Sequence, residues 1–455
     1  MFIKNEKKVL LLNLNTWNND LKGIYDYSTS SIKNEQTFII KPTYLVRTKN
    51  NLFESREMQG LIDYNKEELI FSIRNDVKDN FSLINHIMKN MEVNETNSDY
   101  LNNKIWYVLK TKDLDNREND INSNEEYYLN ENDIIKIGKV KYAVQKINLL
   151  NNYNNINEDA PAIPIIENNY KISELNKNTN PVFEFVFPVK YYNGYCDISE
   201  KNKSDSANIN IFVCKYCNKM DKNEETDDGE NFLISVCKCR QYVHFKCLKN
   251  YIKKLKEISN ENKNKIKVDD SIIFKNFECP CCKSQYPIKF KLPENNKIFN
   301  LVDIEEPNDC NYMILESIDY KYNEQYCKSI HIIKFIKESG EPITIGREYD
   351  NDIVDRDVSI SHHHAILRFN KENGKISIQN WKSKYGTLVL VKKPIKVLDK
   401  KIYLQVGRTY IEVCLTDIDE YNKIKKEQIQ LNKINEGNNG KEKNEKDNDE
   451  NNDKE

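Results

Sequence analysis

The sequence predicts a multidomain α+β fold made of a β-rich N-terminal domain, a small cysteine-rich module and a C-terminal all-β sandwich. Three observations support this division. Apolar runs alternate with Asn- and Lys-rich loops through residues 1–150, and eight Cys and His residues are paired between positions 214 and 282. From residue 310 to 417, short apolar segments separated by turn residues recur roughly every 8–12 positions, as in a sandwich. A length of 455 residues leaves room for about three such domains.

Composition narrows the classes of function. Lys and Arg total 69 against 71 Asp and Glu, so the formal net charge is −2 and no global field draws the chain to nucleic acid or acidic lipid. The apolar run at residues 9–14 is too short for a signal peptide, and no run of about 18 apolar residues predicts a membrane span. Seven of the twelve Cys stand in paired positions, which favours metal binding in a reducing compartment over disulfides. We expect an intracellular protein, cytoplasmic or nuclear.

The N-terminal domain, residues 1–150, is expected to be mostly β. Residues 37–48 and 104–110 are rich in β-branched and aromatic side chains, which predicts strands. Residues 67–91 place apolar side chains three and four positions apart, which predicts a helix.

A second feature of this domain is an internal echo. Residues 134–147 predict two strands folded about Gly138, and residues 404–413 show a similar pattern about Gly407. The domain is therefore either a degenerate second sandwich or an independent mixed fold. Since it contains no Gly-Arg followed by Ser-x-x-His, we expect no phosphate site there.

Two segments predict little fixed structure. Residues 151–210 are Asn-rich with scattered Pro and are expected to serve as a linker, except for an aromatic strand at 181–192. Residues 418–455 form a charged, Asn-rich tail that is expected to be disordered.

The cysteine-rich module, residues 211–290, predicts two zinc sites. Two ligands separated by one or two residues share one tight turn and reach one metal, and four such pairs supply two tetrahedral Zn²⁺ ions. An apolar stripe at helical spacing follows Cys247 and predicts a helix to about residue 260. The paired ligands are Cys214, Cys217, Cys237, Cys239, His244, Cys247, Cys279 and Cys282.

This ligand order, with the segment VHFKCLKNYI at 243–252, resembles the RING-CH (RING-variant) family of ubiquitin ligases. The resemblance implies a cross-brace, in which the first and third pairs hold one zinc and the second and fourth pairs hold the other. Cys281 is left over as an ordinary thiol. The family binds a ubiquitin-conjugating enzyme beside the substrate, so the rate comes from proximity. The implied docking positions are Tyr216, Tyr251, Pro280 and Lys283.

The spacing departs from that family in two places. The gap between Cys239 and His244 is short, and the gap between Cys247 and Cys279 is long. The short gap, with Phe277 two positions before Cys279, also fits a PHD finger, which reads histone tails. A PHD-like or purely structural zinc finger is therefore the alternative.

The stretch ITIGREYDNDIVDRDVSISHHHAILRF, followed by NWKSKYGTLVLV, resembles a forkhead-associated (FHA) domain, the phosphothreonine-binding sandwich. The family's Gly-Arg falls on Gly346 and Arg347, and its Ser-x-x-His falls on Ser361 and His364. The resemblance assigns His364 a scaffolding role, whereas His362 and His363 are expected to face solvent. A guanidinium, a hydroxyl and an ammonium are suitable donors to phosphate. The implied phosphopeptide-binding residues are Arg347, Ser361, Lys384, Tyr385, Gly386 and Thr387.

The two resemblances together predict a RING-type ubiquitin-protein ligase with two Zn²⁺ ions. Its expected partners are a ubiquitin-conjugating enzyme and a phosphothreonine-containing protein that the FHA domain (310–417) recruits. The alternative is a non-enzymatic phosphopeptide-binding adaptor.

Overall fold

The structure is a computed structural model. It describes residues 8–17, 24–27, 32–39, 43–48, 52–55, 67–75, 81–85, 101, 104–109, 126–150, 187–188, 190–192, 213–219, 232–237, 239, 241–257, 269–291, 297–318, 321–322, 325–336, 341–381, 383–392, 394–398, 400–423 and 426. Nearly all of the expected linker and most of the expected tail lie outside these residues.

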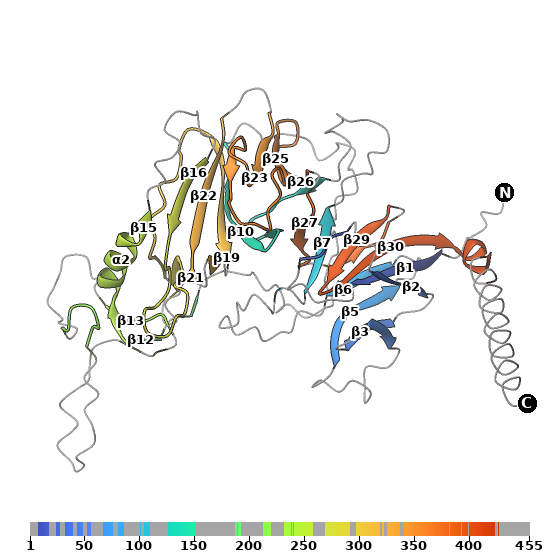
Figure 1. The fold of residues 1–455 in the computed structure, drawn as a ribbon, viewed down its shortest axis with the longest axis horizontal. Helices are drawn as coiled ribbons and strands as arrows, with labels where there is room; N and C mark the ends of the chain where they lie inside the picture. Colours follow the sequence, from blue (N-terminus) through green and yellow to red (C-terminus); the bar gives the residue numbers. More distant parts are fainter. Residues whose placement is uncertain are drawn as a thin grey trace, which may run out of the picture.

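Strands dominate the described chain (Figure 1). The largest sheet has 12 strands and runs in the order β15 (Lys256–Glu257), β16 (Asp269–Phe274), β22 (Lys328–Phe335), β19 (Asn311–Ile318), β10 (Val140–Asn148), β9 (Ile134–Ile137), β27 (Thr387–Leu390), β7 (Ile105–Leu109), β29 (Ile402–Val406), β30 (Thr409–Asp417), β1 (Lys8–Trp17) and β2 (Ile32–Ile39).

Two 5-stranded sheets pack on this large sheet. One runs through β24 (Ile353–Val354), β23 (Ile343–Gly346), β25 (Ala365–Asn370), β26 (Lys375–Asn380) and β8 (Glu126–Tyr128). The other runs through β28 (Ile395–Lys396), β6 (Phe81–Asn85), β5 (Glu67–Asn75), β3 (Thr43–Thr48) and β4 (Leu52–Ser55).

The cysteine-rich module has short elements of its own. They are β11 (Phe187–Pro188) with β17 (Lys289–Lys291) and β18 (Ile298–Asn300), β12 (Lys190–Tyr192) with β13 (Leu233–Ser235) and β14 (Val243–His244), and the helix α2 (Phe245–Lys254). A separate hairpin joins β20 (Lys321–Tyr322) to β21 (Gln325–Tyr326).

The two halves of the chain repeat each other and exchange strands. In order along the chain, β1 corresponds to β19, β2 to β22, and β3–β10 to β23–β30. Under this correspondence the strand order from β22 to β27 matches the order from β2 to β7. The large sheet is therefore symmetric about the pairing of β7 with β27 at its centre. Yet β8–β10 complete the sandwich of the C-terminal half, and β28–β30 complete the sandwich of the N-terminal half.

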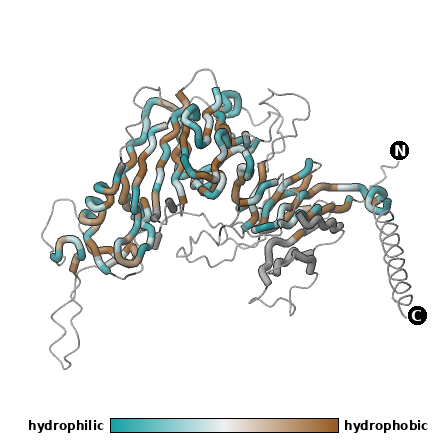
Figure 2. The backbone as a smooth tube through the Cα atoms, viewed as in Figure 1, coloured by the Kyte–Doolittle hydropathy of each residue, from teal (hydrophilic) through white to brown (hydrophobic). Residues whose placement is uncertain are grey.

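The hydrophobic cores confirm the exchange. The core of one sandwich combines Ile137 and Tyr142 with Leu315 and Ile378, whereas the core of the other combines Leu12 and Phe81 with residues 391–413. Apolar and polar residues alternate along many of these strands, as Figure 2 shows. The central strands β9, β19 and β27 are buried at every position, because hydrophobic clusters cover both of their faces. The expected boundary at residue 150 therefore does not separate two cores.

The hairpin about Gly138 is confirmed: β9 pairs antiparallel with β10, and Gly138 takes a φ of 63° at the turn. The echo about Gly407 is the matching hairpin between β29 and β30, with a φ of 50°. The two hairpins occupy equivalent places in the two sandwiches.

The predicted helix at 67–91 is wrong. Residues 67–75 and 81–85 are the antiparallel strands β5 and β6. Leu69, Phe71 and Ile73 recur at period two, and Asn and Asp residues in the segment NDVKDN at 75–80 are typical turn formers. The spacing of three and four arose from joining two strands in one window.

Other expectations hold in part. The strand at 104–110 is confirmed as β7, and 37–48 contains parts of two strands, β2 and β3. Only β11 and β12 of the expected strand at 181–192 are described. Residues 418–423, expected to be disordered, are helical, and the Thr416 hydroxyl donates to Glu420 Oε2 at 2.7 Å. No described helix has the length and apolar character needed to cross a membrane.

Candidate functional sites

The cysteine-rich module is joined to the large sheet. Most of the excursion between Cys247 and Cys279 lies outside the described residues, but its ends form β15 and β16, and β16 pairs along β22 at the sheet edge. The module's core also includes Tyr312 and Ile330 from the sheet. The long gap is therefore the connection between the module and the sandwich.

The first cluster of ligands gathers around the start of α2. The donor atoms of Cys214, Cys217, His244 and Cys247 all lie within 4.8 Å of one another. His244 Nδ1 is 3.2 Å from Cys217 Sγ and 3.8 Å from Cys247 Sγ. A tetrahedral ion with bonds of about 2.3 Å separates its donors by about 3.8 Å, so this cluster could hold a metal ion.

The second cluster consists of Cys237, Cys239, Cys279 and Cys282, whose donor atoms meet the same limit. The Cys239 and Cys279 sulfurs are 3.7 Å apart, and those of Cys237 and Cys239 are closer, at 2.9 Å. Cys281 stays outside the cluster and is exposed, as expected. The first and third pairs thus share one cluster and the second and fourth share the other.

Electrostatics favour a cation in both clusters. Burial, followed by repulsion from Cys214, raises the pKa of the Cys247 thiol to about 12. Burial and the adjacent Cys239 likewise raise the pKa of Cys237. In the same clusters, burial is outweighed by hydrogen bonds to the thiolates of Cys214 and Cys282, which lower the pKa of both groups. Each cluster thus combines thiols that ionise readily with thiols that resist it, and a bound divalent ion would stabilise all of them as thiolates. Across the module, Lys215 Nζ donates to Cys279 Sγ at 3.4 Å and adds positive charge beside the second cluster.

The expected docking residues lie beside these clusters. Tyr216 and Tyr251 stack with ring centroids 5.0 Å apart, and both remain half-buried. Pro280 is exposed on the turn between Cys279 and Cys282. Lys283 is also exposed, with its Nζ 3.1 Å from Glu278 Oε1.

The loops of the C-terminal sandwich form the second site. Gly346 is the last residue of β23. Only glycine fits at this position, because a Cβ would lie 2.0 Å from the carbonyl oxygen of His362. The next residue, Arg347, donates its backbone N–H to Ser361 O at 3.0 Å. This contact places the guanidinium beside the Ser361 loop, where Arg347 Nη2 is 3.3 Å from His362 Nε2.

His364 ties two binding loops together. Its Nδ1 accepts from the backbone N–H of Ser361 at 3.0 Å, and its Nε2 donates to Gly386 O at 3.1 Å. The side chain is fully buried, and this burial lowers the pKa of His364 to about 4. A neutral imidazole with its proton on Nε2 satisfies both bonds, which agrees with a scaffolding role.

The loop before β27 carries the remaining expected residues. Lys384 is exposed and donates its backbone N–H to Ser361 Oγ at 3.1 Å, and its Nζ lies 5.4 Å from the ring of half-buried Tyr385. Gly386 is buried with a φ of 71°. Thr387 is also fully buried, and its hydroxyl donates to Asn380 Oδ1 at 2.9 Å. Thr387 therefore fixes the loop from inside.

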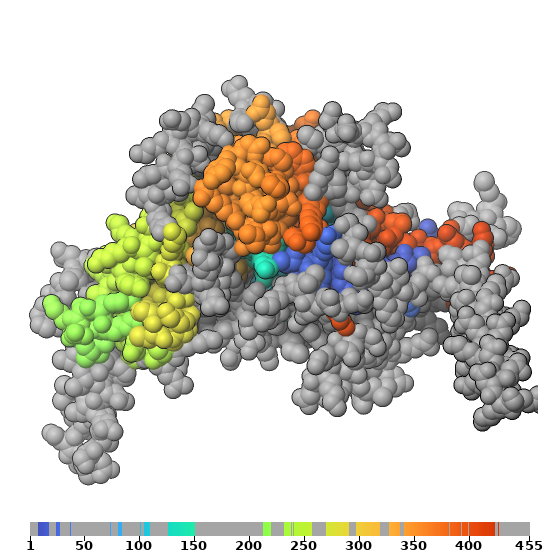
Figure 3. Space-filling view, viewed as in Figure 1, coloured from blue at the N-terminus to red at the C-terminus, as the bar shows by residue number. Residues whose placement is uncertain are grey.

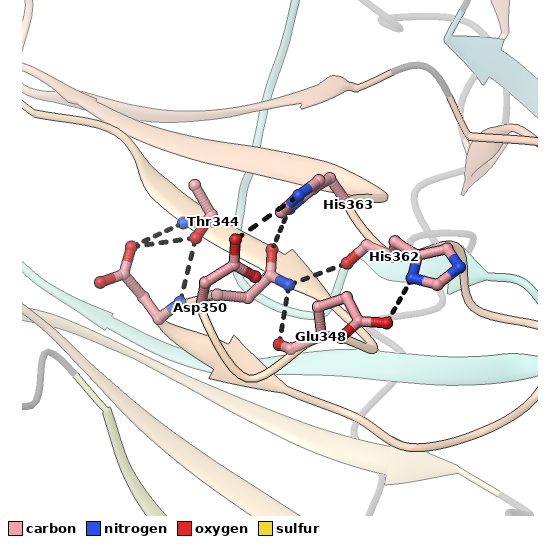
Figure 4. Close-up of polar contacts among 7 residues, drawn as sticks. Thr344, Glu348, Asp350, His362 and His363 are labelled. Atoms are coloured by element: carbon pink, nitrogen blue, oxygen red, sulfur yellow. Dashed lines mark hydrogen bonds and ion pairs between the residues drawn. The ribbon is translucent and has the colours of Figure 1, made fainter.

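His362 and His363, which were expected to face solvent, also contact neighbouring side chains. His362 is exposed, and its Nδ1 contacts Glu348 Oε1 (Figure 4). Because its Nε2 lies beside Arg347 Nη2, His362 links that carboxylate to Arg347. His363 packs against the Trp381 ring with centroids 4.7 Å apart and lies 3.6 Å from Asp350 Oδ2.

Asn351, which is buried, is a structural residue of this site that the FHA motif did not predict. Its side-chain amide donates to the carbonyl oxygens of Glu348 and His362, at 2.9 and 2.8 Å. These bonds join the loop of Arg347 to the loop of Ser361. Since Asn is common in ordinary turns, position alone gave no signal for this role.

Comparison with known proteins identifies the sandwich. Residues 343–425 match the model of the FHA domain family. No curated protein and no solved structure matches the chain. The chain thus contains an FHA domain, a fold whose loops bind phosphothreonine peptides. The matched segment includes β28–β30, which complete the other sandwich, and leaves out β8–β10, which complete the one that carries Arg347.

Proposed function

We propose that this protein is a RING-type ubiquitin-protein ligase that its FHA domain recruits to phosphothreonine-containing partners. The observation that carries the proposal is the alternation of the four ligand pairs between two clusters, in a chain that also contains an FHA domain. The metal we propose is zinc, because three thiolates with an imidazole, or four thiolates, are donor sets typical of structural zinc sites.

In this proposal the module acts as a scaffold. Zinc supplies the structural centre around which the loops of Tyr216 and Pro280 and the helix α2 are held. A conjugating enzyme binds on Tyr216, Tyr251 and Pro280, and the adjacent ammonium of Lys283 is available for a polar contact. The rate increase comes from holding the charged enzyme beside a substrate lysine, with no covalent step on this chain.

In the sandwich, the proposed phosphate donors are the guanidinium of Arg347, the hydroxyl of Ser361 and the ammonium of Lys384. They come from three different loops, which Asn351 and His364 hold together. Charge-assisted hydrogen bonds of this kind are about twice as strong as neutral ones, which suits a phosphate dianion.

A non-enzymatic adaptor is the second candidate. The pairing of β16 with β22 favours the adaptor, because it fixes the module to the edge of the sheet. In that case the sole role of the metal-bound module is to stabilise the sandwich. A PHD-like reader belongs to the same class, and it predicts that the cysteine-rich module binds histone tails.

An autoubiquitination assay with a panel of conjugating enzymes separates the two. The ligase proposal predicts ubiquitin chains from the wild type and a loss of chains in Cys214→Ser and His244→Ala. Cys281→Ser is the matched control, because that thiol is exposed and outside both clusters. Equal chain formation by all four proteins, or none by the wild type with any enzyme, would leave the adaptor.

A further inference from the structure

A short N-terminal segment, residues 24–27, is anchored on the outside of the large sheet by aromatic side chains. Trp17 stacks on Tyr25 with centroids 4.6 Å apart, and its indole N–H donates to Asp26 O at 3.1 Å. Tyr27 packs edge-on against Trp17 and Tyr410, each at 5.4 Å. The backbone of Asp26 is thereby held between two fixed rings.

This segment contacts the FHA loop that carries Lys384. A Cβ added at Gly386 would lie 2.8 Å from the ring of Tyr27. Asp26 Oδ2 lies 3.6 Å from Lys384 Nζ, and the Asp26 side chain keeps 16% exposure. In Figure 3, N-terminal atoms in blue lie directly against the orange surface of the C-terminal sandwich. A carboxylate from one half of the chain thus borders the phosphate-binding loops of the other half.

The Ser361 loop is held from the N-terminal half as well. The backbone N–H of Lys139, in the exchanged hairpin, donates to Ser359 Oγ at 2.7 Å, and Gly138 is packed closely against Ser359. Two of the three proposed donors, Ser361 and Lys384, are therefore positioned by contacts with residues 24–27 and 138–139. The carboxylate of Asp26 has a fixed place relative to them.

We propose that Asp26 is a specificity-determining residue of the phosphothreonine site, which selects peptides with basic residues next to the phosphothreonine and rejects acidic ones. The inference rests on the phosphothreonine binding proposed above. Asp26 places a negative charge beside the loop that carries Lys384, so it attracts a Lys or Arg of the peptide and repels an Asp or Glu.

The strength of this selection follows from the charges. A peptide side chain beside the loop lies within about 10 Å of the Asp26 carboxylate, and at such a distance near a protein surface one unit charge changes affinity by about 15-fold before screening and by about fivefold once salt screens part of the interaction. Salt weakens the effect, because the charges are close to solvent.

The test measures the affinities of the full-length protein for three phosphothreonine peptides that differ only in having Lys, Ala or Asp on either side of the phosphothreonine. The wild type should bind the Lys peptide about fivefold better than the Ala peptide and the Asp peptide about fivefold worse. In Asp26→Asn these differences should fall below about twofold, and Asp26→Glu should restore them. Asp303→Asn is the matched control, since it also removes one carboxylate from an ion pair with a lysine, Lys249, in the cysteine-rich module.

If Asp26→Asn has the melting temperature of the wild type and the same ratios of affinity for the three peptides, the proposed role of Asp26 is wrong. Phosphothreonine binding itself would still stand. Wild-type protein that binds none of the peptides of a phosphothreonine library would remove both.

Discussion

Lowering the pH from about 7 to about 5 should weaken the C-terminal sandwich through His364. Burial disfavours the imidazolium form and lowers the pKa of His364 from 6.5 to about 4, so the unfolded chain binds the proton more readily than the folded one. The contribution of the neutral side chain to stability is therefore fully present above pH 6.5 and is lost as the pH falls toward 4. Between these limits the free energy of unfolding should fall by about 3 kcal/mol, of which about 2 kcal/mol is lost by pH 5.

The comparison with His364→Gln isolates this effect. Gln can both accept and donate a hydrogen bond but does not titrate, whereas other groups, including the metal ligands, contribute equally in both proteins. Urea denaturation at both pH values should show a loss of stability that is larger by about 2 kcal/mol in the wild type. Equal losses in the two proteins would refute the assignment of a buried, neutral His364.

Three further predictions concern the architecture. Gly386→Ala should lower the free energy of unfolding by about 2 kcal/mol or more in a thermal melt, because φ is 71° and Tyr27 occupies the space of the methyl group. Gly374→Ala, at a φ of 62° in the turn between β25 and β26, is the control for the strain of a positive φ and should cost less. Residues 310–455 expressed alone should give a poorly dispersed amide spectrum, and fusing residues 101–150 to them should restore dispersion; a well-folded isolated fragment would contradict the strand exchange. Metal analysis should find about two zinc ions per chain, and chelating them should expose the buried face of α2 to hydrogen exchange. Unchanged protection of Leu248 and Ile252 after chelation would contradict a structural metal.

Local patterns in the sequence were enough to locate both candidate sites. The paired spacing of Cys214 to Cys282 predicted two ligand clusters, because residues on one turn must share a centre. The Gly-Arg and Ser-x-x-His motifs placed Arg347, Ser361 and His364 on adjoining loops, since each motif includes the residues that shape its own turn. The glycine at each hairpin turn fixed the strands on either side of Gly138 and Gly407.

Partners distant in the sequence could not be predicted in this way. A strand's period-two pattern says that one face is buried but not which strand lies beside it, so β8–β10 gave no sign that they complete the C-terminal sandwich. The same limit hid the contacts of Asp26 with Lys384 and of Tyr27 with Gly386, which join residues more than 350 positions apart. The motif likewise shows the position of Thr387 but not that its hydroxyl bonds Asn380 inside the domain.

The most direct test of phosphothreonine recognition is the affinity of the full-length protein for a phosphothreonine peptide selected from a library. The structure predicts binding that disappears when the peptide is dephosphorylated and weakens by about tenfold to a hundredfold in Arg347→Ala, because charge-assisted bonds to the phosphate are lost. Arg368→Ala, which removes the same charge from β25, should bind as the wild type does. Equal affinity of the wild type and Arg347→Ala for the phosphorylated peptide would contradict the site.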